Sequence, residues 1–388
     1  MASTDLPQGW TWEGVLARLG EYADLEKSAR EHGVIVRKRV IRTGAQLLRL
    51  MLAYVLSGFS LRTTAAWAEA AGQASFSDVA LLKRLRRCGP WLAELVGIMG
   101  AHANPEAICG GYGRRIVAVD ATTICSPGGR NKRYRVLHTV YDIGAQCFRV
   151  TLLTERSEAE RLDIGEIEQG EIRLGDRAYG RYRDLAAVAA AGADYVVRLS
   201  ATALTLTTED RKPFRRAVLC SQAEREGRIQ EVTVLVHDRG GNKPLKARLI
   251  VLPLPPEKAE AARRQMRKNA RDWGYSPSDD ALVTAGCVML ITSLAAEEWP
   301  AERVLALYRL RWQVELAFKR LKSLLALETL RAFDSALVSA WVHAVLLVAL
   351  IIDLERPSVH TEALDSPRWS PADVPSHFGV SLPSSFAA

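Results

Sequence analysis

Short strand-like runs that end in an acidic residue are the feature that most limits the fold of this chain. Residues 116–119 are apolar and are followed by Asp120, and residues 171–175 form a second such run before Asp176. Runs of this length fit buried strands better than helices. The same interval has β-rich runs at residues 136–143, 147–154 and 194–199, and helical patterns at residues 157–169 and 181–191. The order β-β-β-α-β-α-β predicts a mixed sheet with helices available to cover its faces.

The flanking segments predict further domains, because their patterns differ from that of the central interval. Residues before 108 have an all-helical pattern, and residues 200–286 combine alternating strand-like runs with a basic helix. A chain of 388 residues is long enough for two or three domains. We predict an α/β fold, α+β overall, with a helical domain at 1–107, a mixed-sheet domain in two parts at 108–199 and 287–356, a mainly β insertion with a basic helix at 200–286, and a Pro/Ser-rich tail at 357–388.

The charge of the chain favours a polyanionic partner. Its net charge is +8, and the basic residues are gathered in clusters around residues 37–49, 83–87 and 263–271. An excess of basic over acidic residues indicates the kind of partner and does not indicate the fold.

The cysteines and the apolar segments exclude several classes of protein. The six cysteines form no Cys-x-x-Cys pair, and no set of Cys and His residues has the spacing of zinc ligands. Scattered cysteines indicate a reducing compartment, and the first residues lack the pattern of a signal peptide. Residues 336–354 are long enough to span a membrane but contain His343 and Asp353, so we predict a buried core helix. We therefore expect a cytoplasmic protein with no membrane partner.

A pair of helices near residue 70 has the outline of a helix-turn-helix. Ser60 caps a helix at residues 60–69, a turn follows, and Ser77 caps a second helix that runs to residue 88. Helix, short turn and basic helix is the arrangement of many DNA readers. A solvated basic face on a helical bundle is the alternative. The basic residues proposed to contact DNA are Lys83, Arg84 and Arg87.

A helix predicted across residues 308–322 carries a narrow stripe of polar groups. Tyr308, Arg311, Glu315 and Lys322 stand at offsets 0, 3, 7 and 14, which lie within about 60° of one another on a helix surface. A carboxylate between two cations and a phenol suits a phosphodiester held beside a metal ion. The alternative is ordinary helix chemistry, with Glu315 paired to Lys319 and Tyr308 in the core.

Three carboxylates suggest a metal site. Asp120 and Asp176 end two predicted neighbouring strands, and Glu315 follows on a later helix. Three such groups can hold two divalent cations, an arrangement that suits phosphodiester cleavage and transfer. Because no His or Cys is among these ligands, Mg²⁺ is the expected metal and Mn²⁺ the expected substitute. Each Asp taken alone also fits a simple turn former.

Taken together, these residues resemble the insertion-sequence-four family of DDE transposases. That family has a Tyr-x2-Arg-x3-Glu-x6-Lys signature, which the stripe matches at every position. Its two Asp contexts resemble residues 119–122 and 175–180 of this chain. The resemblance covers roughly residues 115–350.

The resemblance implies a ribonuclease-H-like catalytic domain interrupted by an insertion. Asp120, Asp176 and Glu315 would bind two Mg²⁺ ions, while Tyr308, Arg311 and Lys322 would hold phosphates around the transposon end. The family cleaves its element at the terminal inverted repeats and joins the 3′ ends to target DNA, working as a dimer on double-stranded DNA. A bacterial cytoplasmic protein that associates with the nucleoid when bound to DNA is implied. A catalytically inactive DNA-binding repressor and a nuclease without strand joining are the alternatives.

The insertion carries further candidate DNA contacts. Arg263, Arg267 and Arg271 recur at every fourth position and fit either a solvated helix face or phosphate contacts. Some members of the family stack a flipped base on a tryptophan from this region. Trp273 is the nearest candidate here, and its alternative is a hydrophobic anchor after the helix.

Overall fold

The computed structural model describes residues 11–36, 40–102, 112–125, 134–155, 159–238, 240–324, 330, 332 and 334–354. The predicted tail at 357–388 lies outside the described residues. The chain divides into two compact units. Unit 1 comprises Met1–Ile108, Asp120–Ala159 and Trp312–Val359, and unit 2 comprises Cys109–Val119, Glu160–Arg311 and His360–Ala388.

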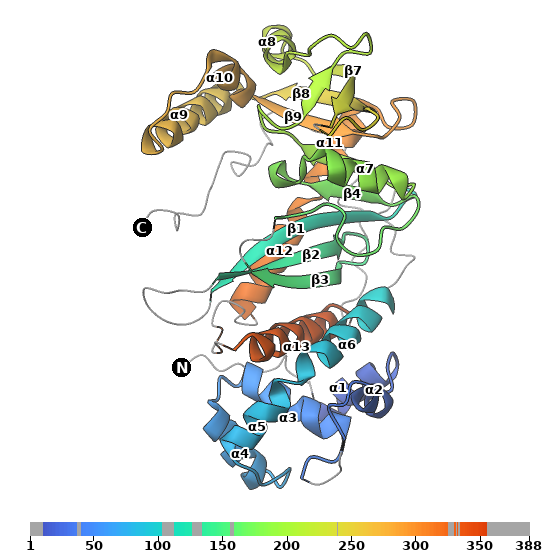
Figure 1. Cartoon of the computed structure of the whole chain (residues 1–388), viewed down its shortest axis with the longest axis vertical. Helices are drawn as coiled ribbons and strands as arrows, with labels where there is room; N and C mark the ends of the chain where they lie inside the picture. Colours follow the sequence, from blue (N-terminus) through green and yellow to red (C-terminus); the bar gives the residue numbers. More distant parts are fainter. Residues whose placement is uncertain are drawn as a thin grey trace. The chain divides into compact units, whose positions relative to one another are not determined.

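Unit 1 begins with helices, as the sequence predicts. Thr11, Asp24, Thr43, Ser60 and Ser77 each precede a helix and accept a backbone N–H from its first turn. Leucines 47, 48 and 50, together with Met51, are completely buried. The helices are α1 Trp12–Gly20, α2 Leu25–Glu31, α3 Gly44–Leu56, α4 Leu61–Ala70, α5 Asp78–Leu85 and α6 Cys88–His102 (Figure 1).

The rest of unit 1 is a small β-region with two helices. Strand β1 (Ile116–Cys125) begins in unit 2 and crosses into unit 1, where it neighbours the hairpin of β2 (Tyr134–Asp142) and β3 (Cys147–Glu155). The helices are α12 (Trp312–Leu324) and α13 (Ser335–Leu354). Phe148 of β3 stacks on Phe318 of α12, with ring centroids 5.7 Å apart.

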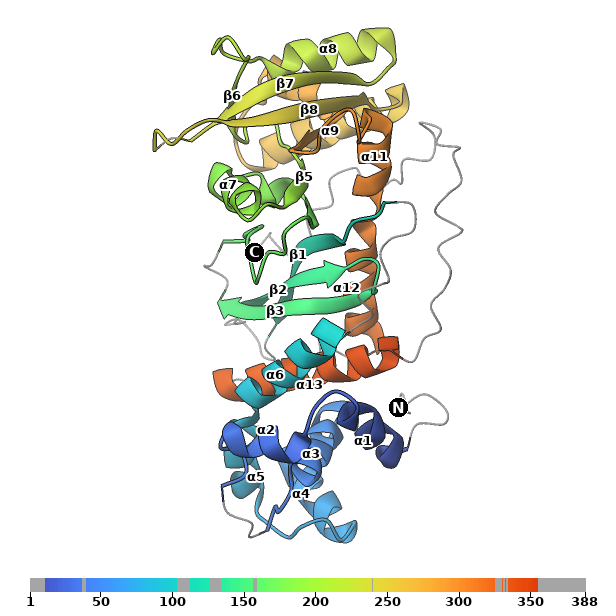
Figure 2. The same ribbon diagram turned by 90° about the vertical axis from the view of Figure 1, so that its right-hand side faces the viewer.

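Helix α13 is the hydrophobic centre of unit 1. It packs along α6 and also touches α3 and β3, and both views show α6 and α13 side by side (Figures 1 and 2). Among the described residues it alone is long and apolar enough to cross a membrane, but 78% of its Ser335–Ile352 window is buried inside the protein. The prediction of a buried core helix is confirmed.

Unit 2 is a mixed sheet covered by helices. Its strand order is β1-β4-β5-β9-β8-β7-β6, with β1, β4 and β5 parallel and the later pairs antiparallel. The predicted mixed sheet is therefore confirmed. The strands are β4 Ile172–Gly175, β5 Asp194–Arg198, β6 Thr205–Thr207, β7 Gln230–His237, β8 Leu245–Pro253 and β9 Cys287–Thr292; the helices are η1 Arg177–Tyr179, α7 Tyr182–Ala190, α8 Arg216–Glu226, α9 Pro256–Asp272, α10 Asp279–Ala285 and α11 Ala301–Arg309.

The region at 200–286 differs from the mainly β insertion expected. Its helices α8, α9 and α10 have 11, 17 and 7 residues, whereas its strands β6, β7 and β8 have only 3, 8 and 9. Arg215 precedes α8 without a side-chain cap, so the sequence does not mark where that helix starts. Helix α8 packs on β7 and β8 (Figure 2), and β8 pairs with β9, which joins these strands to the sheet.

The helix predicted at residues 157–169 is wrong for the described residues from 159 onward. The buried guanidinium of Arg173 donates hydrogen bonds to the carbonyls of Leu162, Ile164 and Glu166 at 2.7–2.8 Å. Carbonyls that point at Arg173 are not available for helical hydrogen bonds. Arg173 also pairs with Glu171 at 2.6 Å, and both side chains are completely buried.

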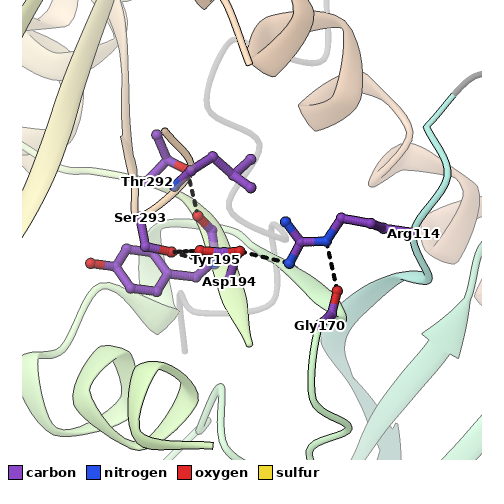
Figure 3. Close-up of polar contacts among 7 residues, drawn as sticks. Arg114, Gly170, Asp194, Tyr195, Thr292 and Ser293 are labelled. Atoms are coloured by element: carbon purple, nitrogen blue, oxygen red, sulfur yellow. Dashed lines mark hydrogen bonds and ion pairs between the residues drawn. The ribbon is translucent and has the colours of Figure 1, made fainter. Parts of the chain in front are cut away.

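A polar cluster fixes the parallel strands at their amino ends (Figure 3). Arg114, just before β1, donates to the carboxylate of Asp194 at 2.6 Å and to the carbonyl of Gly170 at 2.7 Å. Ser293, just after β9, donates to Asp194 at 2.6 Å, and Thr292 donates to the carbonyl of Tyr195 at 2.7 Å. The cluster therefore joins the starts of β1, β4 and β5 to the end of β9, and sets their register.

Replacing Arg173 with Met should lower the free energy of unfolding by about 3–5 kcal/mol, because it removes a buried cation that pairs with the buried carboxylate of Glu171. Adding Glu171→Leu should recover only part of this loss, since three carbonyls stay without their donor. Arg161→Met is the matched control. It breaks a pair in which Arg161 is exposed and Asp163 is 12% exposed, and it should change stability by about 1 kcal/mol. Urea unfolding checks all three, and equal losses in the two arginine variants would contradict the interpretation.

The stability of unit 1 should depend on pH through Asp334. Its hydrogen bonds with Arg86 lower the pKa of the Asp334 carboxyl to about 2. A depressed pKa stabilises the folded state above the unfolded value of about 3.9, and this contribution is lost as the pH falls toward 2. Asp334→Asn keeps an acceptor for the N–H of Leu337 but removes the charge. The difference in melting temperature between wild type and this variant should shrink between pH 6 and pH 2, and Arg86→Gln should behave alike. A difference in melting temperature that stays constant from pH 6 to pH 2 would contradict the stabilising role of the ionised Asp334.

Candidate active site and DNA-contact residues

Asp176 follows β4 at a tightly packed turn. Its Oδ1 accepts the N–H of Ala178 at 2.8 Å and so caps the short helix η1. The preceding Gly175 has no room for a side chain, because an added Cβ would lie 2.9 Å from Tyr179 and 3.0 Å from Leu162. The carboxylate is therefore held by its own loop.

Asp120 lies within β1 and not at its end, which corrects the expectation from the sequence. The strand continues to Cys125 because Thr122, Thr123 and Ile124 are β-branched and favour extended backbone. The Oδ1 atom of Asp120 accepts the N–H of Ala121 at 2.8 Å.

The pairing of β1 with β4 explains why both acids look alike in sequence. The parallel register pairs Ile116 with Ile172, and its last recorded partners are Ala118 and Leu174. Asp120 and Asp176 each come two residues later.

The signature residues are not on one helix. Helix α11 ends at Arg309 and α12 begins at Trp312, and between them the N–H of Arg311 bonds the carbonyl of Tyr308 at 3.1 Å. The single continuous helix predicted across residues 308–322 is therefore wrong. Tyr308 and Arg311 belong to unit 2, whereas Glu315 and Lys322 belong to unit 1, where both are half-buried.

Within unit 2, Tyr308 shares its surroundings with Asp176. The side chain is only 4% exposed, and burial raises the pKa of its hydroxyl. Arg311 and Arg198 act against this rise in pKa, while the charge of Asp176 adds to it. The structure thus brings the phenol, one acid and several arginines of unit 2 together.

Sequence reasoning missed several members of this group. Burial lowers the pKa of Arg198 to about 10, and the like charge of Arg177 adds to the effect. Burial also raises the pKa of Glu160, and the charge of Asp176 adds to that shift. Arg198 ends β5 and could have been found by noting that this strand neighbours the one before Asp176.

No group of three or more His, Cys, Asp or Glu side chains in the described part of the chain lies close enough to hold a metal ion. Asp120 and Glu315 belong to unit 1 and Asp176 to unit 2. The chemistry of the donors nevertheless fits a hard cation, because all three offer carboxylate oxygens.

The helix pair α4 and α5 forms, but α5 ends at Leu85 and not at residue 88 as predicted. The basic residues of this region differ in how available they are. Lys83 and Arg87 are exposed. Arg84 donates to the carbonyl of Val34 at 3.1 Å, and Arg86 pairs with Asp334. The exposed basic groups of this region are therefore fewer than the sequence suggests, and DNA binding by it stays a prediction.

The arginines of helix α9 also differ in exposure and in their partners. Arg263 pairs with Glu224 and donates to the carbonyl of Leu282 at 3.1 Å, so it is held within the fold. Arg267 is exposed and pairs with Glu260 at 3.3 Å, and Arg271 is exposed.

Two aromatic side chains follow α9 on the surface. Trp273 is 69% exposed, so the alternative that it anchors the helix in a hydrophobic core is wrong. Tyr275, which the sequence reasoning did not single out, is 57% exposed. Base stacking by Trp273 stays a prediction.

Comparison with known proteins identifies the family. A model of the transposase DDE domain matches residues 111–351, which is more than half of the chain. The chain belongs to the DDE transposase family. The putative transposase InsL for insertion sequence element IS186A of Escherichia coli (strain K12) is 42% identical over 361 residues, covering 90% of this chain and 95% of that protein. The transposase for insertion sequence element IS421 of Escherichia coli is 42% identical over 362 residues, with the same coverage.

A more distant relative is the transposase for insertion sequence element IS231E of Bacillus thuringiensis subsp. finitimus. It is 23% identical over 175 residues, which is 42% of this chain and 36% of that protein. The predicted membership of the insertion-sequence-four transposases is confirmed by the full-length relatives. The mixed sheet is consistent with the ribonuclease-H-like domain of such transposases, which act on DNA and generally use divalent metal ions. The matched range contains Asp120, Asp176 and Glu315.

Substituting Gly175 with Ala tests how tightly the Asp176 turn of this transposase is packed. The new methyl group would overlap Tyr179 and Leu162, so the free energy of unfolding should fall by about 1–3 kcal/mol. Gly97→Ala is the control, because the added Cβ meets no atom within 4 Å on α6 and should stabilise the helix by about 0.5–1 kcal/mol. Denaturant unfolding measures both variants. An unchanged free energy of unfolding for Gly175→Ala would show that the turn accommodates the methyl group and is not tightly packed.

Proposed function

We propose that this transposase binds the terminal inverted repeats of its insertion sequence, cleaves the DNA ends and joins the freed 3′ ends to target DNA. Asp120, Asp176 and Glu315 hold two Mg²⁺ ions, for which Mn²⁺ substitutes. When bound, the metal ions activate the attacking oxygen and stabilise the leaving oxygen of the phosphodiester. The protein's own part is to hold the ions and to orient the DNA.

The observation that carries this proposal is the register of β1 and β4. Ala118 and Leu174 are partners in the parallel pair, and Asp120 and Asp176 follow them at the same offset. Because β1 and β4 run in the same direction and both acids come two residues after paired residues, this register supports a single site that both carboxylates serve.

The position of Glu315 in the chain supports its role as the third ligand. Tyr308 and Arg311 lie in the surroundings of Asp176 within unit 2. Glu315 follows Arg311 by four residues, in the first turn of α12. Tyr308, Arg311 and Lys322 hold phosphates of the transposon end.

The proposed partner is double-stranded DNA, held by a homodimer that brings two ends together in a synaptic complex. The exposed Lys83 and Arg87 of the helix pair contact the inverted repeats, and the exposed Arg267 and Arg271 contact phosphates. Arg84 and Arg263 contribute less, because both are already bonded within the fold. The protein acts in the bacterial cytoplasm, on the nucleoid.

Removing any one carboxylate should abolish catalysis and spare binding. Asp120→Asn, Asp176→Asn and Glu315→Gln should each slow Mg²⁺-dependent cleavage of the element's own end DNA by about 100-fold or more, because metal ions supply several kcal/mol of transition-state stabilisation. Binding of that DNA should stay within about threefold of wild type, measured by gel shift.

Matched controls are Asp280→Asn and Glu260→Gln, which remove surface acids paired with Arg215 and Arg267. Both should cleave like wild type. Cleavage that survives Glu315→Gln would refute the site. A wild type that binds its ends without cutting them would support a repressor, and nicks without joined products would support a nuclease.

A further inference from the structure

We propose that Val79, on the exposed side of α5, reads one base pair of the transposon end by contacting the 5-methyl group of a thymine in the major groove. This inference rests on the proposed binding of the inverted repeats by the helix pair α4 and α5. It adds a residue that selects the base sequence to a region for which only basic residues have been proposed.

Helix α5 has a buried side and an exposed side. Leu81 and Leu85 are completely buried and lie on one side of the helix, four residues apart. Val79, Ala80 and Lys83 are exposed. At 3.6 residues per turn these three fall within about 100° of one another, on the side opposite the two leucines. They define the α5 face, the side of this helix that the described part of the chain leaves open to solvent.

The start of α5 holds this face in place. The hydroxyl of Ser77 accepts the backbone N–H of Ala80 at 3.2 Å, and the carboxylate of Asp78 accepts that of Val79 at 2.8 Å. The helix also packs against α4, α6 and α13. A side chain carried by a capped and packed helix is positioned more precisely than one on a loop, as the recognition of a base requires.

The fold itself gains little from a valine at position 79. The side chain of Val79 is 56% exposed, so it adds little to the hydrophobic core. Valine is also a weaker helix former than alanine, because its branched Cβ restricts χ1. The two methyl groups of Val79 are therefore available to a partner, and their removal should leave the fold intact.

Charge around the α5 face indicates the partner. Residues 60–88 contain five basic residues and two acidic ones. Arg86 is paired with Asp334, whereas Lys83 and Arg87 are exposed, so this segment keeps a positive excess. An apolar side chain beside cations suits the major groove, where the edges of the bases lie between two rows of phosphates.

The position of Val79 along the helix selects the edge of a base. In helix-turn-helix proteins the first residues of the second helix contact base edges. Val79 and Ala80 are the second and third residues of α5. Thymine presents a 5-methyl group in the major groove, and apolar side chains contact this group. Val79 therefore matches a thymine better than it matches the other three bases.

Replacing single thymines of the end DNA with deoxyuridine tests the contact, because this change removes one methyl group and keeps the base pair. Wild type should lose affinity about fourfold at one thymine, the effect of one buried methyl group. Val79→Ala should bind the natural end about fourfold more weakly than wild type and should lose nothing further at that thymine. Val79→Thr, which keeps one methyl group, should fall between the two.

Two further variants serve as controls. Val218→Ala removes a valine of α8 that is 60% exposed, and it should respond to every thymine as wild type does. Lys83→Gln should weaken binding to end DNA and to unrelated DNA alike, and should lower the slope of log affinity against log salt by about 1. Val79→Ala should keep the wild-type slope and the wild-type affinity for unrelated DNA.

Three outcomes would overturn the proposal. The first is equal sensitivity of wild type and Val79→Ala at every thymine, and the second is a wild type that responds to no thymine. The third is equal end binding by both proteins together with weaker self-association of Val79→Ala in sedimentation, which would assign the α5 face to a second copy of the chain.

The design separates this inference from the proposed function. All binding is measured in the Glu315→Gln background, so no step depends on cleavage. If the protein that retains Val79 does not prefer its own ends to unrelated DNA, the proposed function fails and this inference fails with it. If that protein prefers its ends and Val79→Ala shows the same preference and the same response to deoxyuridine, only the role of Val79 fails.

Discussion

The register of the parallel strands β1, β4 and β5 is the constraint on which the rest of the structure depends. Arg114 holds it at the amino end through Asp194 and the carbonyl of Gly170. A slip of one residue would turn every side chain of a strand to the opposite face. The same register therefore decides where Asp176 and Arg198 emerge at the other end of the sheet.

Unit 2 contains a buried arginine that is fully bonded within the fold. Arg173 is completely buried, pairs with Glu171 and donates hydrogen bonds to three carbonyls. Near Asp176, burial lowers the pKa of Arg198, and the like charges of Arg177 and Arg311 add to this shift.

The sequence predicts what is encoded locally. Ser60 and Ser77 each cap the start of a helix with a single side chain. The apolar run before Asp120 is by itself enough to predict a buried strand. Prediction from the sequence fails where contacts between residues far apart in the chain determine the structure. The apolar spacing continues across the break before Trp312, with no Gly or Pro to mark it. The irregular path of residues 159–170 depends on Arg173, and the importance of Arg198 depends on which strands become neighbours.

The central claim is that three carboxylates, carried by β1, by the turn after β4 and by α12, serve one two-metal site. Electron paramagnetic resonance of Mn²⁺, titrated into the full chain bound to already cleaved end DNA without target DNA, tests this most directly. Wild type should hold two ions per protomer, and Asp120→Asn, Asp176→Asn and Glu315→Gln should each hold fewer. A variant that keeps both ions with unchanged affinity would remove that residue from the metal site and contradict the claim.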